Sequence, residues 1–406
     1  MDTCSYFPRT ENPEPVEAVA SNRQYNFASK KLADWTTLGI GGTASKFLTA
    51  YSEDEIVEAI RTADEEGTPV LLLGGGSNML VSDEDFDGLV VRDMRSNYTI
   101  EHDSGCGGVV VRVDAGMAWD EFVALAVEND WSGVEALSGI PGTVGASPVQ
   151  NVGAYGKEVA DTLSSIRVYD RLLKRRRTLF LSDLEFGYRT SILKRSTMDP
   201  SLSEGRLWGP TGRWIVLTVE FQFTHASLSL PIGYGQLANT LGVKVGERAD
   251  QRDVRAAVLE LRRSKSMVLA DANRNTWSTG SFFTNPIVSL DQAEKLPAEA
   301  PRYPVRAIAP AGSVPTPDLI DEGVVKTSAA WLIDHAGFGR GFKVRSDSAA
   351  AVSSAHVLAL TNLGGASMAD MAELAVAVRD GVWQKWGVEL VPEPVTVGWK
   401  FPELKA

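Results

Sequence analysis

The sequence predicts a protein of the α/β class with more than one domain. The chain has 406 residues, which corresponds to two or three domains at roughly 150 residues per domain. Hydrophobic residues make up 44% of the chain and charged residues 23%, as in ordinary folded proteins. Near the N-terminus, segments with strand and helix patterns alternate, which is the order typical of an α/β layer.

The first strand and helix of this layer are marked by clear local signals. Residues 43–50 have a strand pattern, and Ser52 and Glu55 then have the spacing of a helix capping box. The short apolar run 70–73 is typical of a buried strand. Directly after it stand Gly74, Gly75, Gly76, Ser77 and Asn78. Because folds of this class place ligands at the carboxyl ends of strands, these residues are the first candidate site.

Further strands and helices follow along the chain. We expect strands near 109–113, 165–169, 177–181 and 214–223, and helices near 119–128, 253–263, 329–335 and 369–385. Ser367 and Asp370 form a capping pair for the last helix. The polar stretch 195–213 predicts a long surface loop, and the proline-dense stretch 297–317 predicts extended backbone. The basic run 174–177 predicts a solvated strand edge.

Charge and cysteine content exclude several classes of protein. Lys and Arg number 40 against 52 Asp and Glu, and a net charge of −12 repels nucleic acid and anionic lipid. Cys4 and Cys106 form neither a disulfide framework nor a metal-ligand spacing, so we expect no metal site. The N-terminus lacks the pattern of a signal peptide, and no apolar run is long enough to span a bilayer. We therefore expect a cytoplasmic protein that neither binds nucleic acid nor inserts into membranes.

Two glycine-rich segments are the strongest candidates for a ligand site. The second runs from Ser138 to Gly156 and is almost free of charge. The first does not fit G-x-G-x-x-G, because Met79 stands at the third glycine position, and the second does not fit a P-loop, because Glu158 follows Lys157. Backbone N–H groups in two such loops can hold a pyrophosphate without cationic side chains. The alternative is that the glycines only form tight turns.

Several motifs stand in a characteristic order along the chain. They are Gly74-Gly75-Gly76-Ser77-Asn78, Ile140-Pro141-Gly142-Thr143-Val144-Gly145, Gln150-Asn151-Val152-Gly153-Ala154-Tyr155-Gly156, Gly187-Tyr188-Arg189-Thr190-Ser191, Gly280-Ser281-Phe282-Phe283-Thr284-Asn285-Pro286, Ala330-Trp331-Leu332-Ile333-Asp334 and Pro392-Glu393-Pro394. This order resembles that of the UDP-N-acetylenolpyruvoylglucosamine reductases over about residues 25–398. The resemblance implies a cytoplasmic enzyme of peptidoglycan precursor synthesis that binds FAD non-covalently and takes hydride from NADPH.

The same resemblance implies the domain organisation and the reaction. An FAD-binding domain of the vanillyl-alcohol oxidase type, built of two α/β subdomains, would be followed by a smaller α/β substrate-binding domain. The chain then divides into a loose N-terminal extension (1–24), an FAD-binding domain (25–262, with subdomains of about 25–97 and 98–262) and a C-terminal domain (263–406). In the implied reaction, hydride passes from NADPH to FAD and from flavin N5 to the vinyl carbon of UDP-N-acetylglucosamine enolpyruvate, which gives UDP-N-acetylmuramate.

Three residues match the catalytic positions of the family. Arg189 would stabilise the negative charge that develops toward the substrate carboxylate. Ser281 would donate the proton, and Glu393 would assist Arg189 and the proton transfer. Without the motifs, an arginine in a strand-like context fits a solvated face, the serine fits a turn cap, and the carboxylate between two prolines fits an edge strand. The sequence contains no G-x-S-x-G elbow and no triad order among its four histidines, so a hydrolase is unsupported.

The resemblance also implies contacts with cofactor and substrate. The expected FAD contacts are Gly74, Gly75, Gly76, Ser77, Asn78, Ile140, Pro141, Gly142, Thr143, Gly145, Ala146, Ser147, Gly153 and Tyr155. The expected UDP-sugar contacts are Tyr188, Tyr234, Lys265 and Asn285, with Tyr234 in a loop that closes over the substrate. Lys265 offers a point charge for phosphate.

Two other functions remain open at this point. The first is a different oxidoreductase on the same FAD scaffold, such as an oxidase of small alcohols. Many of those enzymes attach the flavin to a histidine in the first glycine loop, and residues 74–78 contain none. The second is a non-catalytic regulator that binds flavin or a UDP-sugar, which would have no need for the proton donor Ser281.

Overall fold

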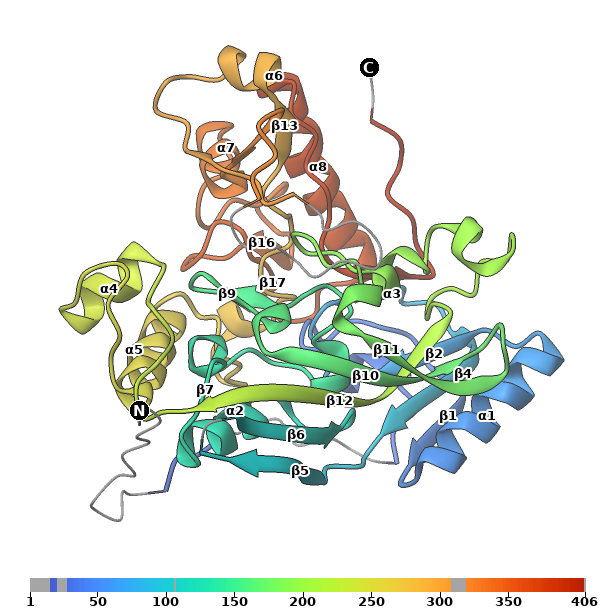
Figure 1. Cartoon of the computed structure of the whole chain (residues 1–406). Coiled ribbons are helices and arrows are strands. Elements are labelled where there is room, and N and C mark those ends of the chain that lie inside the picture. Colours follow the sequence, from blue (N-terminus) through green and yellow to red (C-terminus); the bar gives the residue numbers. More distant parts are fainter. Residues whose placement is uncertain (1–14, 20–27, 106, 308–318, 405–406) are drawn as a thin grey trace.

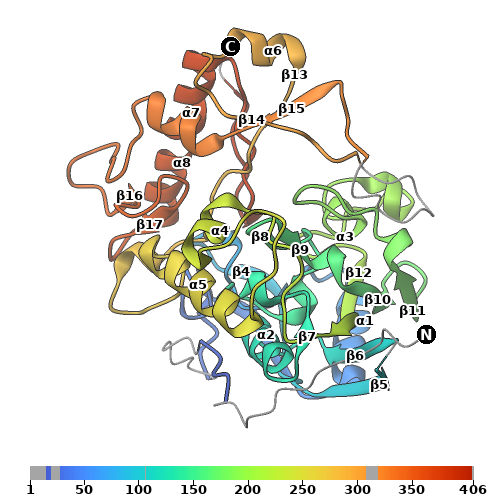
Figure 2. The same cartoon turned by 60° about the vertical axis from the view of Figure 1, so that its left-hand side comes forward.

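The computed structural model describes residues 15–19, 28–105, 107–307 and 319–404. Two sheets with their helices form a broad body, and the C-terminal elements stand above it (Figure 1). The second view separates the helices of the C-terminal part from the sheets of the body (Figure 2). The prediction of an α/β protein is confirmed. No helix in the described residues is both long and apolar enough to cross a membrane.

The first sheet is parallel and has the strand order β1-β4-β2. Its strands are β1 (Ala44–Ala50), β2 (Val70–Leu73) and β4 (Phe86–Asp93), and helix α1 (Glu53–Glu66) connects β1 to β2. The predicted capping box is confirmed, because Ser52 Oγ accepts from the Glu55 N–H at 3.2 Å and the Glu55 carboxylate accepts from the Ser52 N–H. Buried Ile56 and Ile60 of α1 pack on this sheet. The strand β1 and the helix α1 therefore form where the strand pattern and the capping box predict them.

The second sheet is antiparallel and follows the order β11-β10-β12-β6-β5, with β7 paired to the end of β12. The strands are β5 (Tyr98–Ser104), β6 (Gly108–Asp114), β7 (Trp131–Ser132), β10 (Leu163–Asp170), β11 (Arg175–Phe180) and β12 (Trp214–His225). Helix α2 (Trp119–Glu128) covers it with the buried rings of Trp119 and Phe122, which contact Phe221 of β12. Residues 175–177 of the basic run lie on the edge strand β11, as expected, and Lys174 lies in the turn before it.

Shorter elements connect this sheet to the C-terminal part. They are the strand pair β8 (Gly153–Ala154) and β9 (Lys157–Glu158), and helices α3 (Ile192–Arg195), α4 (Gly235–Leu241) and α5 (Gln251–Ser264). Helix α5 covers the predicted helix 253–263 and places Lys265 directly after its last turn. The connection from α5 therefore leads straight into the candidate site.

In its described residues, the C-terminal part combines three α-helices with small sheets. Strands β13 (Ile287–Ser289), β14 (Arg302–Tyr303) and β15 (Val324–Thr327) form one sheet, and β16 (Ala350–Val352) pairs with β17 (Leu360–Asn362). The helices are α6 (Leu290–Lys295), α7 (Ala329–His335) and α8 (Met368–Trp386). Ser367 and Asp370 form the predicted capping box of α8. Residues 308–317 of the proline-dense stretch lie outside the described residues.

The end of the chain returns to the first half of the molecule. Strand β18 (Val395–Val397) pairs in parallel with β3 (Met79–Val81), the short strand that follows the first glycine loop. Leu38, Ile40 and Leu80 also pack into the hydrophobic core of the C-terminal part. The two halves are therefore joined by a strand pair and by shared core residues, and not only by the chain connection near α5.

The polar stretch 195–213 differs from its prediction. Trp208 is only 6% exposed, and the Arg171 guanidinium lies 4.4 Å from the centroid of its ring. The Leu72 N–H at the end of β2 donates to Thr211 Oγ1 at 2.7 Å. The prediction of a surface loop is therefore wrong at this end of the stretch, because cation–π contact and a backbone hydrogen bond hold the polar segment against the body.

A buried ion pair holds α2, α5 and the start of the second glycine segment together. Both Asp120 oxygens accept from Arg255, each at 2.8 Å, and Asp120 Oδ1 also accepts from the Gly139 N–H at 2.6 Å. Residues 15–19 of the expected loose extension lie here too, since the Val19 N–H donates to Asp120 Oδ2 at 2.6 Å. Burial raises the pKa of Asp120, but these hydrogen bonds outweigh burial and the pKa is lowered.

Replacing Asp120 by Asn should lower the free energy of unfolding by about 3–5 kcal/mol near neutral pH, because Arg255 stays buried without its charge partner. The pKa of Asp120 is lower in the folded protein than its unfolded value of about 3.9, so its ion pair stabilises the fold at pH values above about 3.9. This stabilisation is lost as the pH falls through the folded-state pKa. The difference in melting temperature between wild type and D120N should therefore narrow in acid. The exposed Asp87→Asn is the matched control. A D120N melting temperature equal to that of D87N would contradict the assignment.

Candidate active site

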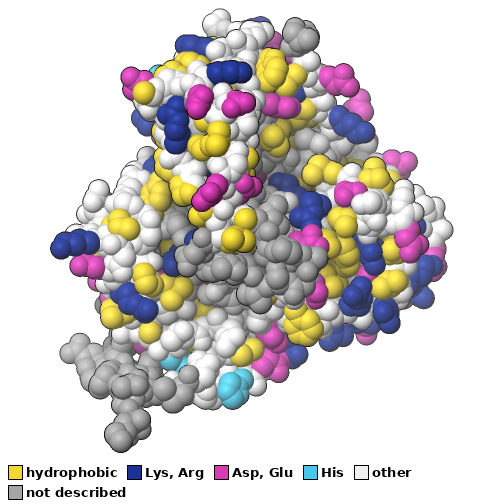
Figure 3. Space-filling view, turned by 45° about the horizontal axis from the view of Figure 1, so that its top comes forward, with side chains coloured by type: hydrophobic (Ala, Val, Ile, Leu, Met, Phe, Trp, Pro, Cys, Tyr) yellow, Lys and Arg dark blue, Asp and Glu magenta, His cyan; other side chains and the backbone are white. Residues whose placement is uncertain are grey.

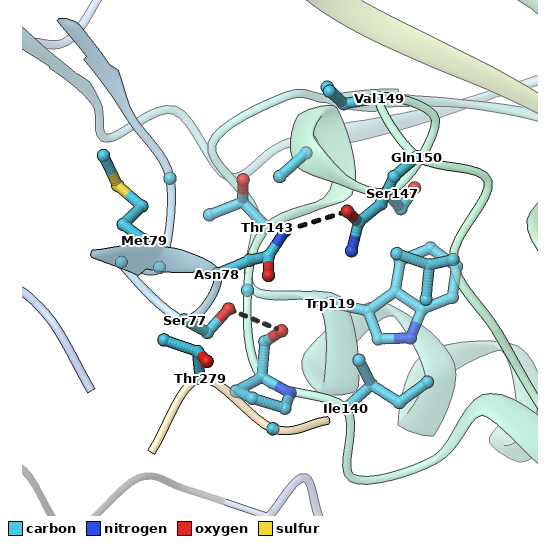
Figure 4. A pocket seen from close by; sticks show the side chains of 18 of the residues that line it. Ser77, Asn78, Met79, Trp119, Ile140, Thr143, Ser147, Val149, Gln150 and Thr279 are labelled. Carbon is cyan, nitrogen blue, oxygen red and sulfur yellow. Dashed lines mark hydrogen bonds between the residues drawn. The ribbon is translucent and has the colours of Figure 1, made fainter. Parts of the chain in front are cut away.

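A cavity of about 500 Å³ opens where the two sheets of the body meet the C-terminal part. All fourteen residues expected to contact FAD lie on its lining: Gly74, Gly75, Gly76, Ser77, Asn78, Ile140, Pro141, Gly142, Thr143, Gly145, Ala146, Ser147, Gly153 and Tyr155. Figure 4 shows side chains of both glycine-rich segments around the cavity. The polar stretch 195–213 contributes Thr211 and Pro210 to one wall. The two glycine-rich segments thus share one pocket.

The glycines let the two loops touch backbone to backbone. A Cβ on Gly75 would stand 2.7 Å from the Cα of Gly142, closer than real Cβ contacts. Ser77 Oγ donates to the Pro141 carbonyl at 3.1 Å across the same boundary (Figure 4). Gly76 has a φ of +60° and Gly142 one of +128°, which glycine adopts at little cost. The tight-turn explanation therefore covers only part of the pattern, since close loop packing also requires glycine.

The first loop also offers free donors to a ligand. Among the described residues, none accepts a hydrogen bond from the backbone N–H of Gly75, Gly76 or Ser77. The buried Thr279 Oγ1, which also lines the pocket, has no hydrogen-bond partner in the described part of the chain either. Successive backbone N–H groups of this kind bind anions such as a pyrophosphate. The residues of the pocket therefore fit FAD.

The three expected catalytic residues meet at this cavity. Arg189 Nε lies 3.5 Å from Glu393 Oε1, and Arg189 Nη2 donates to the Gly153 carbonyl at 2.7 Å. The Glu393 N–H donates to the Phe282 carbonyl at 2.8 Å, which places Glu393 beside the segment that carries Ser281. No described residue is hydrogen-bonded to the Ser281 hydroxyl, which faces the same cavity. The arrangement brings a cation, a carboxylate and an available hydroxyl together.

Arg189 does not stand in the strand-like context that the sequence suggests. Gly187 and Thr190 exchange backbone hydrogen bonds across a tight turn, and Arg189 within it has a φ of +55°. A non-glycine residue with positive φ is uncommon and is maintained only where the surroundings require it. The turn aims the guanidinium at Glu393, so the unusual backbone serves the position of this side chain.

The expected substrate contacts fall into two groups. Tyr234 and Lys265 line the cavity, and the Tyr234 ring meets the Tyr155 ring edge-on at 5.6 Å between centroids. Tyr188 and Asn285 are not among the described residues of the lining, but they contact each other, since the Asn285 N–H donates to the Tyr188 hydroxyl at 3.3 Å. The Arg189 guanidinium lies 5.5 Å from the centroid of the Tyr188 ring, and the contact between Tyr188 and Asn285 joins the body to the C-terminal part.

Three further residues of the lining carry no role in the sequence prediction. Gln150 lies in one of the motifs given above, and Lys194 stands three residues after Ser191 of another. Their closeness to these motifs was the sequence signal that could have pointed to them as site residues. Burial lowers the pKa of Lys194. His356 has no motif nearby; burial and the charges of neighbouring Lys and Arg side chains lower its pKa to about 4. Its ring is therefore neutral near neutral pH.

Comparison with known proteins gives long matches at high identity. The UDP-N-acetylenolpyruvoylglucosamine reductase of Cutibacterium acnes is 47% identical over 367 residues, which cover 90% of this chain and 89% of that protein. The Thermobifida fusca enzyme of the same name is 47% identical over 371 residues, which cover 90% and 96%. The crystal structure of the Thermus caldophilus reductase has a TM-score of 0.57 and 23% identity, and covers 90% of this chain and 97% of that chain. This last similarity concerns the fold.

Two family models match separate parts of the chain. Residues 44–172 match the family described as FAD binding domain, and with the glycine-lined pocket this defines the class: an FAD-binding flavoprotein. Residues 272–397 match the family described as UDP-N-acetylenolpyruvoylglucosamine reductase, C-terminal domain. The chain belongs to the UDP-N-acetylenolpyruvoylglucosamine reductase family.

Proposed function

We propose that the chain reduces UDP-N-acetylglucosamine enolpyruvate to UDP-N-acetylmuramate in the cytoplasm, as a step of peptidoglycan precursor synthesis, with NADPH as the hydride donor. The observation that carries this proposal is the contact of Arg189 with Glu393, next to Ser281, in a pocket lined by two glycine-rich loops. The domain division 1–24, 25–262 and 263–406 belongs to the proposal. The C-terminal part has a hydrophobic core distinct from that of the second sheet, although Leu38, Ile40 and Leu80 of the body join it, and this supports the division.

FAD would be held by the glycine loops through backbone N–H groups and would not be covalently attached. The fourteen lining residues named above would surround it, with Gly75, Gly76 and Ser77 offering donors to its pyrophosphate. When bound, FAD supplies the hydride transfer from NADPH to the substrate. The protein's own part is to bind both ligands, to stabilise charge and to deliver a proton.

Arg189, Ser281 and Glu393 would divide the work on the substrate. Hydride addition to the vinyl carbon moves electron density toward the substrate carboxylate, and the Arg189 guanidinium, held by Gly153 and Glu393, stabilises that charge. Ser281 Oγ donates its proton to the neighbouring carbon, which is basic enough in an enolate-like species to accept it. Glu393 keeps Arg189 in place and assists the proton transfer.

The UDP-sugar would contact Tyr234 and Lys265 at the cavity and Tyr188 and Asn285 beside it. Lys265 lines the cavity, and its ammonium donates to Gln236 Oε1 at 2.8 Å, which leaves further hydrogens for phosphate. Tyr234 is 42% exposed, which leaves room for its loop to close over a bound substrate.

A substrate-dependent NADPH assay tests this proposal. The purified protein should be yellow and should consume NADPH only when UDP-N-acetylglucosamine enolpyruvate is present. The same sugar nucleotide without the enolpyruvyl group is the control, and it should support no consumption. Colourless protein that binds no FAD, or NADPH consumption that ignores the substrate, would refute the proposal. Flavin that stays attached after denaturation would instead favour an oxidase of the same scaffold.

A further inference from the structure

A chain of amide and charged groups ends on Glu393. Gln150 Nε2 donates to Glu393 Oε1 at 2.9 Å, and Gln150 Oε1 accepts from Asn78 Nδ2 at 2.8 Å (Figure 4 shows the second bond). Lys194 Nζ lies 3.4 Å from Gln150 Oε1 and 3.4 Å from the Glu393 carbonyl. These residues come from the first glycine loop, the second glycine segment, α3 and the C-terminal part. The Gln150 amide is thus the point where four segments meet.

The surroundings allow Gln150 only one orientation. An ammonium has hydrogens to donate and no acceptor, so Lys194 requires an oxygen at the position it faces. Asn78 Nδ2 also donates to the Glu393 carbonyl at 3.4 Å, which makes it a donor toward Gln150 as well. With Oε1 held by two donors, the Gln150 NH₂ group must point at Glu393. Such an amide cannot turn without placing its oxygen against a carboxylate.

The two contacts on the Glu393 carboxylate converge on one oxygen. Gln150 Nε2 and Arg189 Nε both face Oε1, whereas no described residue donates to Oε2. The side chain is 12% exposed, so solvent has limited access to it. Arg189, Lys194 and Tyr188 are ionisable groups that interact with Glu393. Oε2 is therefore the oxygen left for the reaction.

We propose that Gln150 is a positioning residue for the reaction: its amide, oriented by Asn78 and Lys194, holds Glu393 Oε1 and so directs Oε2 toward the substrate and Ser281. This inference rests on the proposed function. Without the Gln150 donor, Glu393 can rotate and pair both oxygens with Arg189, which withdraws the carboxylate and part of the guanidinium from the substrate.

Gln150→Leu and Gln150→Glu test this role. Q150L should lower kcat about 10- to 100-fold, the effect of one hydrogen bond to a charged group, with little change in KM. It should leave flavin content and reduction of the flavin by NADPH unchanged. Q150E places two carboxyl groups 2.9 Å apart, so they share a proton and the kcat profile against pH gains an ionisation that wild type lacks. Exposed Gln222 on β12 provides matched controls, Q222L and Q222E.

The outcomes separate this inference from the proposed function. Wild-type protein that fails to reduce the enolpyruvyl substrate refutes the function. Active wild type, with Q150L at the wild-type kcat and Q150E showing the wild-type pH profile, overturns the role of Gln150 alone. Loss of FAD or equal slowing of both half-reactions in Q150L also overturns it, because Gln150 would then be a structural link between loops.

Discussion

Replacing Ser281 by alanine should leave reduction of the flavin by NADPH at the wild-type rate and slow its reoxidation by the enolpyruvyl substrate by about 10³-fold. General-acid groups contribute roughly 10²- to 10⁴-fold, and the Ser281 hydroxyl lies on the lining of the cavity with no hydrogen bond to any described residue. Rapid mixing separates the two steps: oxidised enzyme with NADPH reports the first, and reduced enzyme with the UDP-sugar reports the second. The alanine should also bind the substrate normally, because only proton delivery is lost.

Two further variants make this result specific. Ser281→Cys retains a side chain of similar size with a proton to give, so it should recover part of the lost rate. Thr284→Val is the control on the same segment, since Thr284 Oγ1 donates to the Val391 carbonyl at 3.3 Å and does not line the cavity. Equal losses of both half-reactions in S281A would show that the role given to Ser281 is wrong.

The parts of the fold that the sequence predicts are those with local causes. Ser52 with Glu55, and Ser367 with Asp370, cap their helices with side chains three residues apart. The spacing seen in the sequence therefore directly predicts the hydrogen-bonded contact seen in the structure. Segment 195–213 has no such local cause. It is polar enough to predict a loop, and contacts with the body, among them those with Arg171, Leu72 and Asp170, hold it in place.

In the candidate site, too, some features are predicted by the sequence and others arise only from the fold. Motif order places Arg189, Ser281 and Glu393 in one site, and the structure brings them to one cavity. The network through Gln150 and Lys194 was not predicted, because Gln150 and Glu393 are 243 residues apart and only the fold brings them into contact. Sequence patterns show which residue types are present, whereas the direction of an amide depends on all its neighbours.

Net charge illustrates what composition can decide about ligands. A charge of −12 argues against binding polyanions, although the face shown in Figure 3 carries both acidic and basic side chains. FAD, NADPH and a UDP-sugar are nevertheless small anions. The backbone N–H groups of the first glycine loop, together with Arg189 and Lys265 on the lining, create a positive potential in the pocket. The net charge of the chain does not reveal this local potential.

Replacing Gly75 by alanine should yield protein without FAD. The new Cβ would lie 2.7 Å from Gly142 Cα and 3.0 Å from Gly142 N, and both neighbours are backbone atoms that no side-chain rotation can clear. The two glycine-rich loops must then separate, and the donors at Gly75, Gly76 and Ser77 move with the first loop. Flavin content after purification and the dissociation constant from flavin fluorescence measure the effect, which should exceed 100-fold, equivalent to about 2.7 kcal/mol.

Gly105→Ala is the matched control for this change. A Cβ there meets no atom of the described residues within 4 Å, so G105A should retain flavin and activity like wild type. Circular dichroism should show that G75A is folded, because the clash lies between two loops at the pocket and outside the hydrophobic cores of either sheet. Folded G75A with a full complement of FAD would mean that the close approach of Gly75 and Gly142 is not needed to bind the cofactor. Folded, flavin-free G75A beside yellow G105A would show that the contact between the loops shapes the FAD site.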